Sequence, residues 1–226
     1  MSNRRFLYLL SILYFMIWAV CAVNPNHFDD WLLENVLVFI AVIAIASTHA
    51  YFPFSRISYF LIFVFLSLHA VGAHYTYSEV PYREWLQQLG FDINLDGRNH
   101  FDRVIHFGYG LLLAYPIREV FIRIASVRGF WGYFLPLDLT MSTSMLYELI
   151  EWVAAEIFGG DLGMAFLGTQ GDIWDAHKDM ALASAGALTA MLVTAIINYS
   201  TQRDFAEEWI DSLRVKKKKP LGESAI

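Results

Sequence analysis

The sequence has little charge and a single cysteine. Lys, Arg, Asp and Glu make up only 17% of its 226 residues, whereas an ordinary soluble domain has about 25%. This composition argues against a soluble fold. Because Cys21 is the only cysteine, no disulfide can form within the chain. The net charge of −6, without a basic patch that interleaves with aromatic residues, indicates that nucleic acid is not a partner.

Apolar residues are abundant and are concentrated in long runs. They make up 57% of the chain, and the runs of about 18–25 residues match the length that crosses about 30 Å of hydrocarbon. We therefore expect an all-α fold, a polytopic membrane helix bundle in one transmembrane domain over residues 1–200. The expected spans are 6–23, 32–51, 57–76, 101–124, 131–158 and 173–199. The first run is too long for a typical signal peptide, so it is expected to stay as an uncleaved span.

Basic residues gather at alternate ends of these spans. The chain has 16 Lys and Arg, and one set of ends holds only Arg83, Arg98, Arg103 and Lys178. By the positive-inside rule the other set of ends, with both termini, is cytoplasmic. The loops near residues 24–31, 76–100 and 159–172 then face outward.

The last part of the chain, residues 201–226, is expected to be a cytoplasmic tail. Phe205, Trp209 and Leu213 recur at every fourth position ahead of the basic run 216–219. This pattern is typical of an amphipathic helix on an anionic leaflet, and a solvated basic tail explains it equally well.

Ionisable residues of the third and fourth spans fall near the outer surface. Asp102 and His106 are four residues apart and share a face in the first turns of the fourth span, with Tyr109 one turn deeper. His69 and His74 reach the same level from the third span. Being five apart, these two histidines do not share a face, so we interpret them as packing or interfacial residues.

The fifth and sixth spans bring carboxylates to the same depth. Glu148 and Glu151 share a face in the outer half of the fifth span, and Asp175 and Asp179 share a face at the start of the sixth. The first two spans are almost free of buried charge, apart from Glu34 near an outer end. Four neighbouring spans are therefore expected to direct their ionisable groups into one outer zone.

A carboxylate near mid-bilayer costs roughly 2.5–3.5 kcal/mol. Several carboxylates persist only if they pair, bind a cation, hold protons or line a wet cavity, and like charges raise one another's pKa. We interpret the cluster as an outward-facing acidic and histidine pocket. The alternative is an inert packing network in which Arg103 and Lys178 neutralise two acids.

Each candidate residue has a chemical role. The candidate catalytic residues are Asp102, His106, Glu148, Glu151, Asp175 and Asp179. The candidate substrate-binding residues are Arg103, Tyr109, Asp172 and Lys178. A divalent metal is a possible cofactor, and its candidate ligands are His106, Glu148, Glu151 and Asp175. Arg103 would pair with a substrate phosphate.

Three classes of function stay open. The leading one is binding or processing of an envelope lipid or lipid-linked molecule, by metal-assisted or general acid–base hydrolysis if the protein is an enzyme. The alternatives are a small proton-coupled transporter or exporter, and a non-catalytic membrane interaction protein. No serine or cysteine is placed as a covalent nucleophile. Membrane lipids are expected partners, and the oligomeric state is not indicated.

Two other patterns have simpler interpretations. Aromatic residues near the outer ends, Tyr75, Tyr77, Trp85 and Trp174, are expected in an interfacial belt. The stretch 92–97, "DINLDG", matches the first half of an EF-hand calcium loop, but its twelfth position would be Arg103 instead of Glu. We interpret it as an Asp-Gly turn.

Three stretches together resemble a known family. "RNHFDRVIHFGYGLL", "YELIEW" and "GTQGDIWDAHKDMALA" resemble the YjdF family of bacterial inner-membrane proteins, over nearly the whole chain. More distantly, the pattern is similar to the VanZ-like superfamily, with Asp102 and His106 in one span, Glu148 or Glu151 in the next, and the Asp175–Asp179 step in the last. At Asp179 that superfamily typically has asparagine. The resemblance implies a bacterial inner membrane and a role at the envelope, and it implies no reaction.

Overall fold

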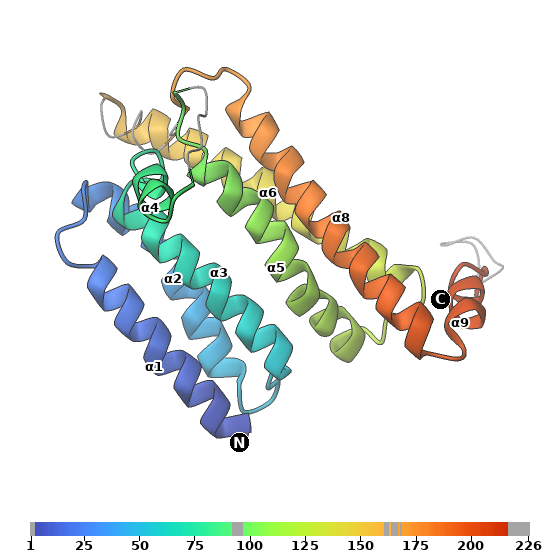
Figure 1. Cartoon of the computed structure of the whole chain (residues 1–226). Coiled ribbons are helices and arrows are strands. Elements are labelled where there is room, and N and C mark those ends of the chain that lie inside the picture. Colours follow the sequence, from blue (N-terminus) through green and yellow to red (C-terminus); the bar gives the residue numbers. More distant parts are fainter. Residues whose placement is uncertain (1–2, 92–96, 161–162, 164–166, 168, 217–226) are drawn as a thin grey trace.

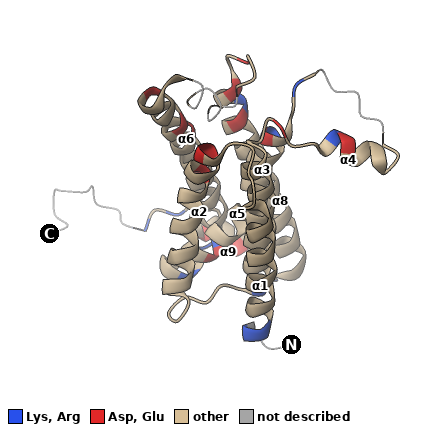
Figure 2. Cartoon of the chain, turned by 90° about the vertical axis from the view of Figure 1, so that its left-hand side faces the viewer, with Lys and Arg blue, Asp and Glu red and all other residues tan. Residues whose placement is uncertain are grey.

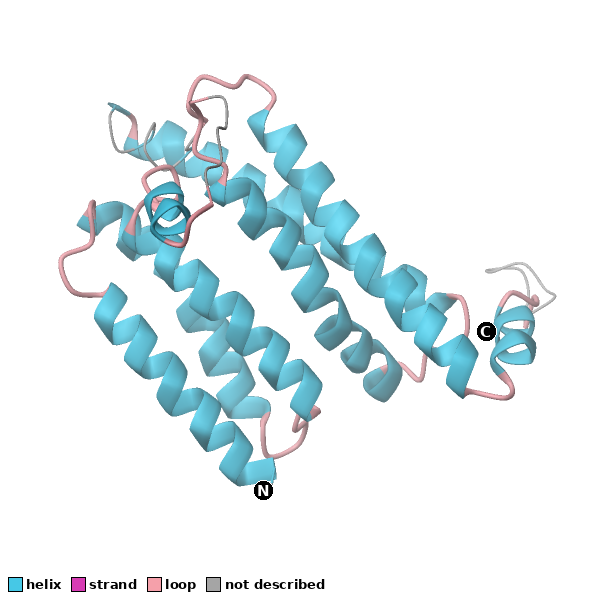
Figure 3. Cartoon of the chain, viewed as in Figure 1, coloured by secondary structure: helices cyan, strands magenta, loops and turns pink. Residues whose placement is uncertain are grey.

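The structure, a computed structural model, describes residues 3–91, 97–160, 163, 167 and 169–216. These residues form eight helices, and no strand is found among them (Figure 3). The fold is therefore the predicted all-α bundle. The calcium-like stretch 92–97 lies outside the described residues except for Gly97, and the tail beyond residue 216 lies outside them as well.

Six long helices run up and down through the bundle (Figure 1). In chain order they are α1 (Asn3–Cys21), α2 (Phe28–Thr48), α3 (Arg56–His74), α5 (Phe101–Ile124), α6 (Trp131–Phe158) and α8 (Asp175–Thr201). Two short helices, α4 (Tyr82–Gln88) and α9 (Phe205–Ser212), lie at opposite ends of the bundle. Because the number of these long helices is even, α1 begins and α8 ends at the same end of the bundle.

The sides of the bundle that face away from its interior are apolar, as a bilayer requires. Phe15, Ile43 and Ile196 expose 65%, 66% and 67% of their surface, which water would penalise and lipid would not. By length and composition α1, α2, α3 and α8 are apolar enough to cross a membrane. Helices α5 and α6 are as long, but they carry the ionisable residues and pack in the same bundle.

Helices α5 and α8 are the most closely packed pair. A side chain at Gly110 would overlap the backbone of Ala183 and Ala187, and one at Gly186 would overlap the backbone of Phe107. Small residues on both helices let the two backbones meet, which is the usual basis of helix association in membranes. This contact fixes the start of α8 against the start of α5.

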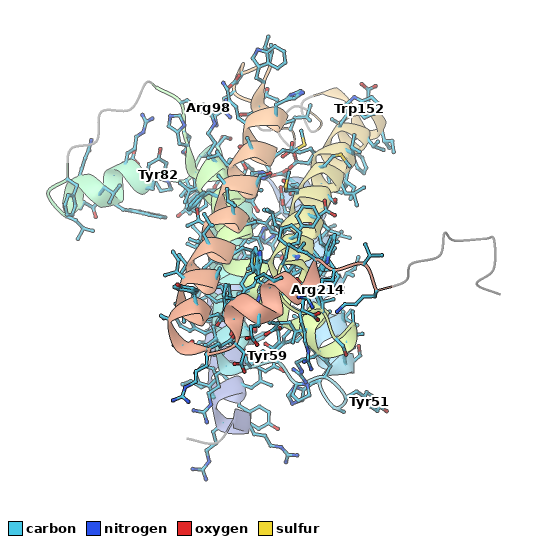
Figure 4. All side chains as sticks on the ribbon, turned by 90° about the vertical axis from the view of Figure 1, so that its right-hand side faces the viewer. Tyr51, Tyr59, Tyr82, Arg98, Trp152 and Arg214 are labelled. Atoms are coloured by element: carbon cyan, nitrogen blue, oxygen red, sulfur yellow. The ribbon has the colours of Figure 1, made fainter. Side chains whose placement is uncertain are left out.

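The two ends of the molecule differ in charge (Figure 2). Most Asp and Glu gather at the end that carries α4, and the N-terminal turn of α1 at the other end is basic. In the view of Figure 4, Arg98 and Trp152 mark the first end, and Tyr51 and Tyr59 mark the second. By the positive-inside rule we call the α4 end the outer end.

The tail begins with the expected amphipathic helix, but its apolar side packs on protein. In α9, Phe205 and Trp209 contact the Tyr133 ring, with centroids 6.1 and 5.6 Å away. The Ser212 hydroxyl accepts a hydrogen bond from the Phe130 N–H at the start of α6 (3.0 Å). Phe205 and Trp209 thus contact the first turn of α6, whereas Leu213 remains 53% exposed. The expectation that this stripe rests on the leaflet stays a prediction.

Candidate functional site

Three groups of polar side chains meet at the outer end of the bundle. They come from α2, α3, α5, α6 and α8 and from the loops that join them.

The first group surrounds one imidazole, and we call it the imidazole cluster: Asp102, His106, Glu148 and Asp179. The His106 Nε2 atom lies 3.4 Å from Asp102 Oδ1, one helical turn before it, and 3.7 Å from Glu148 Oε1 on α6. Asp179 reaches this place because the glycine contact holds α8 against α5. His106 and Asp179 are 8% and 2% exposed, so the cluster is buried although the residues that form it are charged.

The second group, the mouth cluster, consists of Arg98, Arg103, Asp172, Asp175 and Lys178. The Asp175 carboxylate, 4% exposed, pairs with Arg98 and lies 3.5 Å from the Arg103 guanidinium. Asp172 pairs with Arg103 and with Lys178, each at 2.6 Å. Arg98 also donates to the Thr169 carbonyl. The cluster thus ties the loops before α5 and before α8 together.

The Asp172 carboxyl of the mouth cluster has a lowered pKa. The hydrogen bond from Lys178, followed by the Trp174 N–H and the Arg103 guanidinium, lowers the pKa of Asp172 to about 2. Asp172 therefore stays ionised at any physiological pH and acts as an anchor for the start of α8.

The third group is a network of His69, Tyr77, Tyr147 and Glu34. The Tyr147 hydroxyl donates to Glu34 Oε2 at 2.9 Å, and the Tyr77 hydroxyl lies 3.4 Å from the same atom. His69 Nε2 lies 3.2 Å from the Glu34 carbonyl, so that nitrogen carries the proton and Nδ1 accepts from Tyr77 at 2.5 Å. Two phenols therefore meet at the buried Glu34 carboxylate, and His69 contacts the backbone carbonyl of the same residue.

This part of the structure extends one expectation and corrects another. The sequence predicts Glu34 as the exception in a span otherwise almost free of buried charge. Asp30 at the start of α2 is buried as well, and Asp30 and Glu34 are 1% and 5% exposed. Tyr77 was expected in an interfacial belt, but its hydroxyl is directed inward because the turn after α3 brings it over His69. The signal in the sequence was the i, i+4 spacing of Asp30 and Glu34, with Asn35 beside them, in an otherwise apolar run.

A cavity of about 500 Å³ opens from these groups into the bundle between α2, α3, α5 and α6. Its polar lining lies toward the outer end, where Ile105 and Ile150 also line it, and its inner part is lined by apolar residues. The polar residues are His69, Tyr77, Asp102, His106, Tyr109, Thr143, Ser144, Tyr147 and Glu151. The inner part is lined by apolar residues that include Ile45, Phe54, Ile117 and Val120.

The predicted residues divide among these places. Asp102, His106, Glu148 and Asp179 come together in the imidazole cluster, and Tyr109 and Glu151 line the cavity, where the Tyr109 hydroxyl lies 2.6 Å from Thr143 Oγ1. The other four, Arg103, Asp172, Asp175 and Lys178, form ion pairs with one another and with Arg98 at the mouth.

Two groups were placed differently from our expectation or were not foreseen. Among the described residues, the set close enough to hold a metal is Asp102, His106 and Asp179, which shares only His106 with the metal ligands proposed from the sequence. The sequence indicates Arg98 only as one of the basic residues at the outer ends, whereas in the structure it pairs with Asp175. His74 lies apart from the clusters, with Nδ1 2.9 Å from the Cys21 carbonyl.

Comparison with known proteins gives a family and one curated relative. The family model described as "Predicted membrane protein (DUF2238)" matches residues 6–200. The inner membrane protein YjdF of Escherichia coli (strain K12) is 37% identical over 195 residues, which are 84% of this chain and 89% of that protein. No solved structure matches the chain.

Proposed function

The chain belongs to the DUF2238 family of membrane proteins, and we propose that this multi-pass inner-membrane protein binds an envelope lipid or a lipid-linked molecule in the cavity that opens at its outer end. The single observation that carries the proposal is the lengthwise polarity of that cavity. Its carboxylates, imidazoles and phenols all line the outer part, together with aliphatic residues such as Ile105 and Ile150, and its inner part is lined by aliphatic and aromatic side chains. An amphiphile has the same division between head and chain.

The dimensions of the cavity support a long-chain ligand. Its lining residues on α5 run from Asp102 to Val120, which is about 27 Å of helix at 1.5 Å per residue. This is close to the roughly 30 Å thickness of the hydrocarbon core. A small polar solute would leave most of the apolar lining uncovered, whereas an acyl or prenyl chain would cover it.

Beside the polar end of the cavity, although not among its lining residues, the mouth cluster offers partners for a headgroup. Arg98, Arg103 and Lys178 face two carboxylates in the mouth cluster, so the cluster retains positive charge. The Nε–H groups of both arginines are buried without a hydrogen-bond partner among the described residues. Guanidinium groups bind phosphate with charge-assisted hydrogen bonds, which favours an anionic headgroup. Deeper in the cavity, the Ser144 hydroxyl also lacks a partner.

The inner end of the cavity separates this proposal from a proton-coupled transporter. A transport path needs polar groups on both sides of the bound molecule. The lining near the inner end is Phe54, Ile117 and Val120, and Glu119 beside it is held by Ser55, Ser58 and Arg123. The arrangement favours lateral binding of a lipid over passage of an ion.

Filling the apolar part of the cavity tests the proposal. Ala41 lines the cavity on α2, and Ala46 lies on the exposed side of the same helix. Wild-type protein, Ala41→Phe and the matched control Ala46→Phe would be purified from native membranes in mild detergent. Native mass spectrometry would then count the lipid molecules that each retains.

We expect about one amphiphile per wild-type chain and the same for Ala46→Phe, and fewer for Ala41→Phe because its affinity should be at least about tenfold weaker, equivalent to roughly 1.4 kcal/mol. Equal retention by all three proteins, or no retained lipid in the wild type, would contradict the proposal. Adding the extracted lipid back to delipidated protein keeps the test independent of losses during purification, since wild type should rebind it and Ala41→Phe should not.

A further inference from the structure

We propose that Asp102, His106 and Asp179 bind one divalent transition-metal ion at the outer end of the cavity. This site goes beyond lipid binding and does not depend on it. One ligand atom from each residue lies within 4.8 Å of the other two. Helix α5 supplies two of the ligands one turn apart, and α8 supplies the third.

The separation of the two ligands on α5 fits coordination better than hydrogen bonding. For metal–ligand distances of about 2.1 Å, two ligands of a tetrahedral ion lie about 3.4 Å apart. The distance from His106 Nε2 to Asp102 Oδ1 is 3.4 Å, which exceeds the roughly 2.7–3.2 Å of an N–H···O hydrogen bond. The Glu148 Oε1 atom, 3.7 Å from the same nitrogen, is near enough to serve as a fourth ligand or to hold a metal-bound water.

Unpartnered oxygens provide the second, independent observation. Asp179 is 2% exposed, yet its Oδ1 atom has no hydrogen-bond partner among the described residues, and the same is true of Glu148 Oε1. Within the part of the chain that the structure describes, no Lys or Arg pairs with Asp102, Glu148 or Asp179. Leaving a buried acceptor unsatisfied is costly, and a dication among the three carboxylates would remove both the cost and their repulsion.

The donor set indicates the class of ion. Two carboxylates and one imidazole suit Zn²⁺ or Mn²⁺, whereas Mg²⁺ and Ca²⁺ prefer ligand sets made only of oxygen. Three protein ligands leave at least one position open, as in hydrolytic metal sites, where water occupies it. The open position would face the cavity, since both Asp102 and His106 line it.

A protonated His106 that pairs with Asp102 and Glu148 is the competing explanation, and titration with metal distinguishes the two. Full-length protein without an affinity tag would be stripped with chelator, exchanged into detergent buffer and titrated with ZnCl₂ and MnCl₂ by isothermal calorimetry. The variants are Asp179→Asn and His106→Gln. Their matched controls are Asp138→Asn on the exposed side of α6 and His177→Gln on the exposed side of α8.

We expect one equivalent of metal to bind to wild type and to both controls, and affinity to fall by about tenfold or more in Asp179→Asn and His106→Gln. Unchanged melting of the metal-free variants would show that they fold. If Asp179→Asn does not fold, Asp102→Asn takes its place. No binding by wild type, or equal affinity in site variants and controls, would overturn the metal site. Ala41→Phe separates the two proposals, because it should lose lipid and keep the metal.

Discussion

Glu119 and Asp179 are both carboxylates inside the helix bundle, but their surroundings are opposite. At the inner end, Glu119 accepts from the Ser55 N–H, the Ser58 hydroxyl and Arg123, so it has full hydrogen bonding and stabilises the start of α3. At the outer end, Asp179 Oδ1 has no partner among the described residues. A satisfied carboxylate is explained by the fold, whereas an unsatisfied one requires a ligand or a proton. The unsatisfied Asp179 carboxylate therefore indicates a binding site at the outer end.

At the residue scale, the pKa of Asp172 predicts how the stability of the fold depends on pH. Its pKa of about 2 lies below the value of about 3.9 in an unfolded chain, so its ion pairs stabilise the fold above about pH 4. That contribution is lost as the pH falls from 4 toward 2. The difference in unfolding midpoint between wild type and Asp172→Asn should therefore be constant above pH 4 and shrink toward zero by pH 2.

Thermal unfolding in detergent across that pH range measures this difference. Asp29→Asn, at an exposed position near the start of α2, is the control for loss of a carboxylate alone. A difference for Asp172→Asn that stays the same down to pH 2 would show that the ion pairs with Lys178 and Arg103 do not form.

At the scale of elements, the site depends on how closely α5 and α8 approach each other. The small residues around Gly110 and Gly186 let the two backbones meet, and this contact brings Asp179 toward His106. The sequence predicts the existence of each long helix, because hydrocarbon demands about 20 apolar residues with satisfied backbones. Which faces meet is not encoded so directly. The sequence does not show directly that Asp30 and Glu34 lie on the face of α2 that packs against its neighbours.

Gly186→Ala tests this contact. The added methyl group would overlap the Phe107 carbonyl, so we expect a loss of about 1–3 kcal/mol in stability together with weaker metal binding. Ala185→Val, at the exposed neighbouring position, is the control and should change neither. Reversible unfolding in mixed micelles gives the stability change. A variant Gly186→Ala that is as stable as wild type and binds metal equally would show that α5 and α8 pack differently.

At the scale of the whole molecule, charge and polarity are arranged along the membrane normal. The basic ends set the orientation, and the acidic and histidine residues meet at the opposite end, where the cavity opens. Residue depth along each predicted helix is enough to predict this meeting, since 1.5 Å per residue converts sequence position into height. It is not enough to predict partners at one height. Asp175 and Asp179 share a face, yet Asp175 turns to Arg98 and Asp179 to the imidazole cluster.

The most direct test of the central claim, that the outer clusters and the apolar cleft form one binding site, is an experimental density map of the protein in nanodiscs of native lipid. We expect a continuous elongated density between α2 and α6, with its broad end beside Tyr147 and His106 and its narrow end beside Ile117. Closure of the apolar part of the cavity by contact of α2 with α6 on the inner side of the Tyr147–Glu34 hydrogen bond, or only separate water-sized peaks there, would contradict the claim.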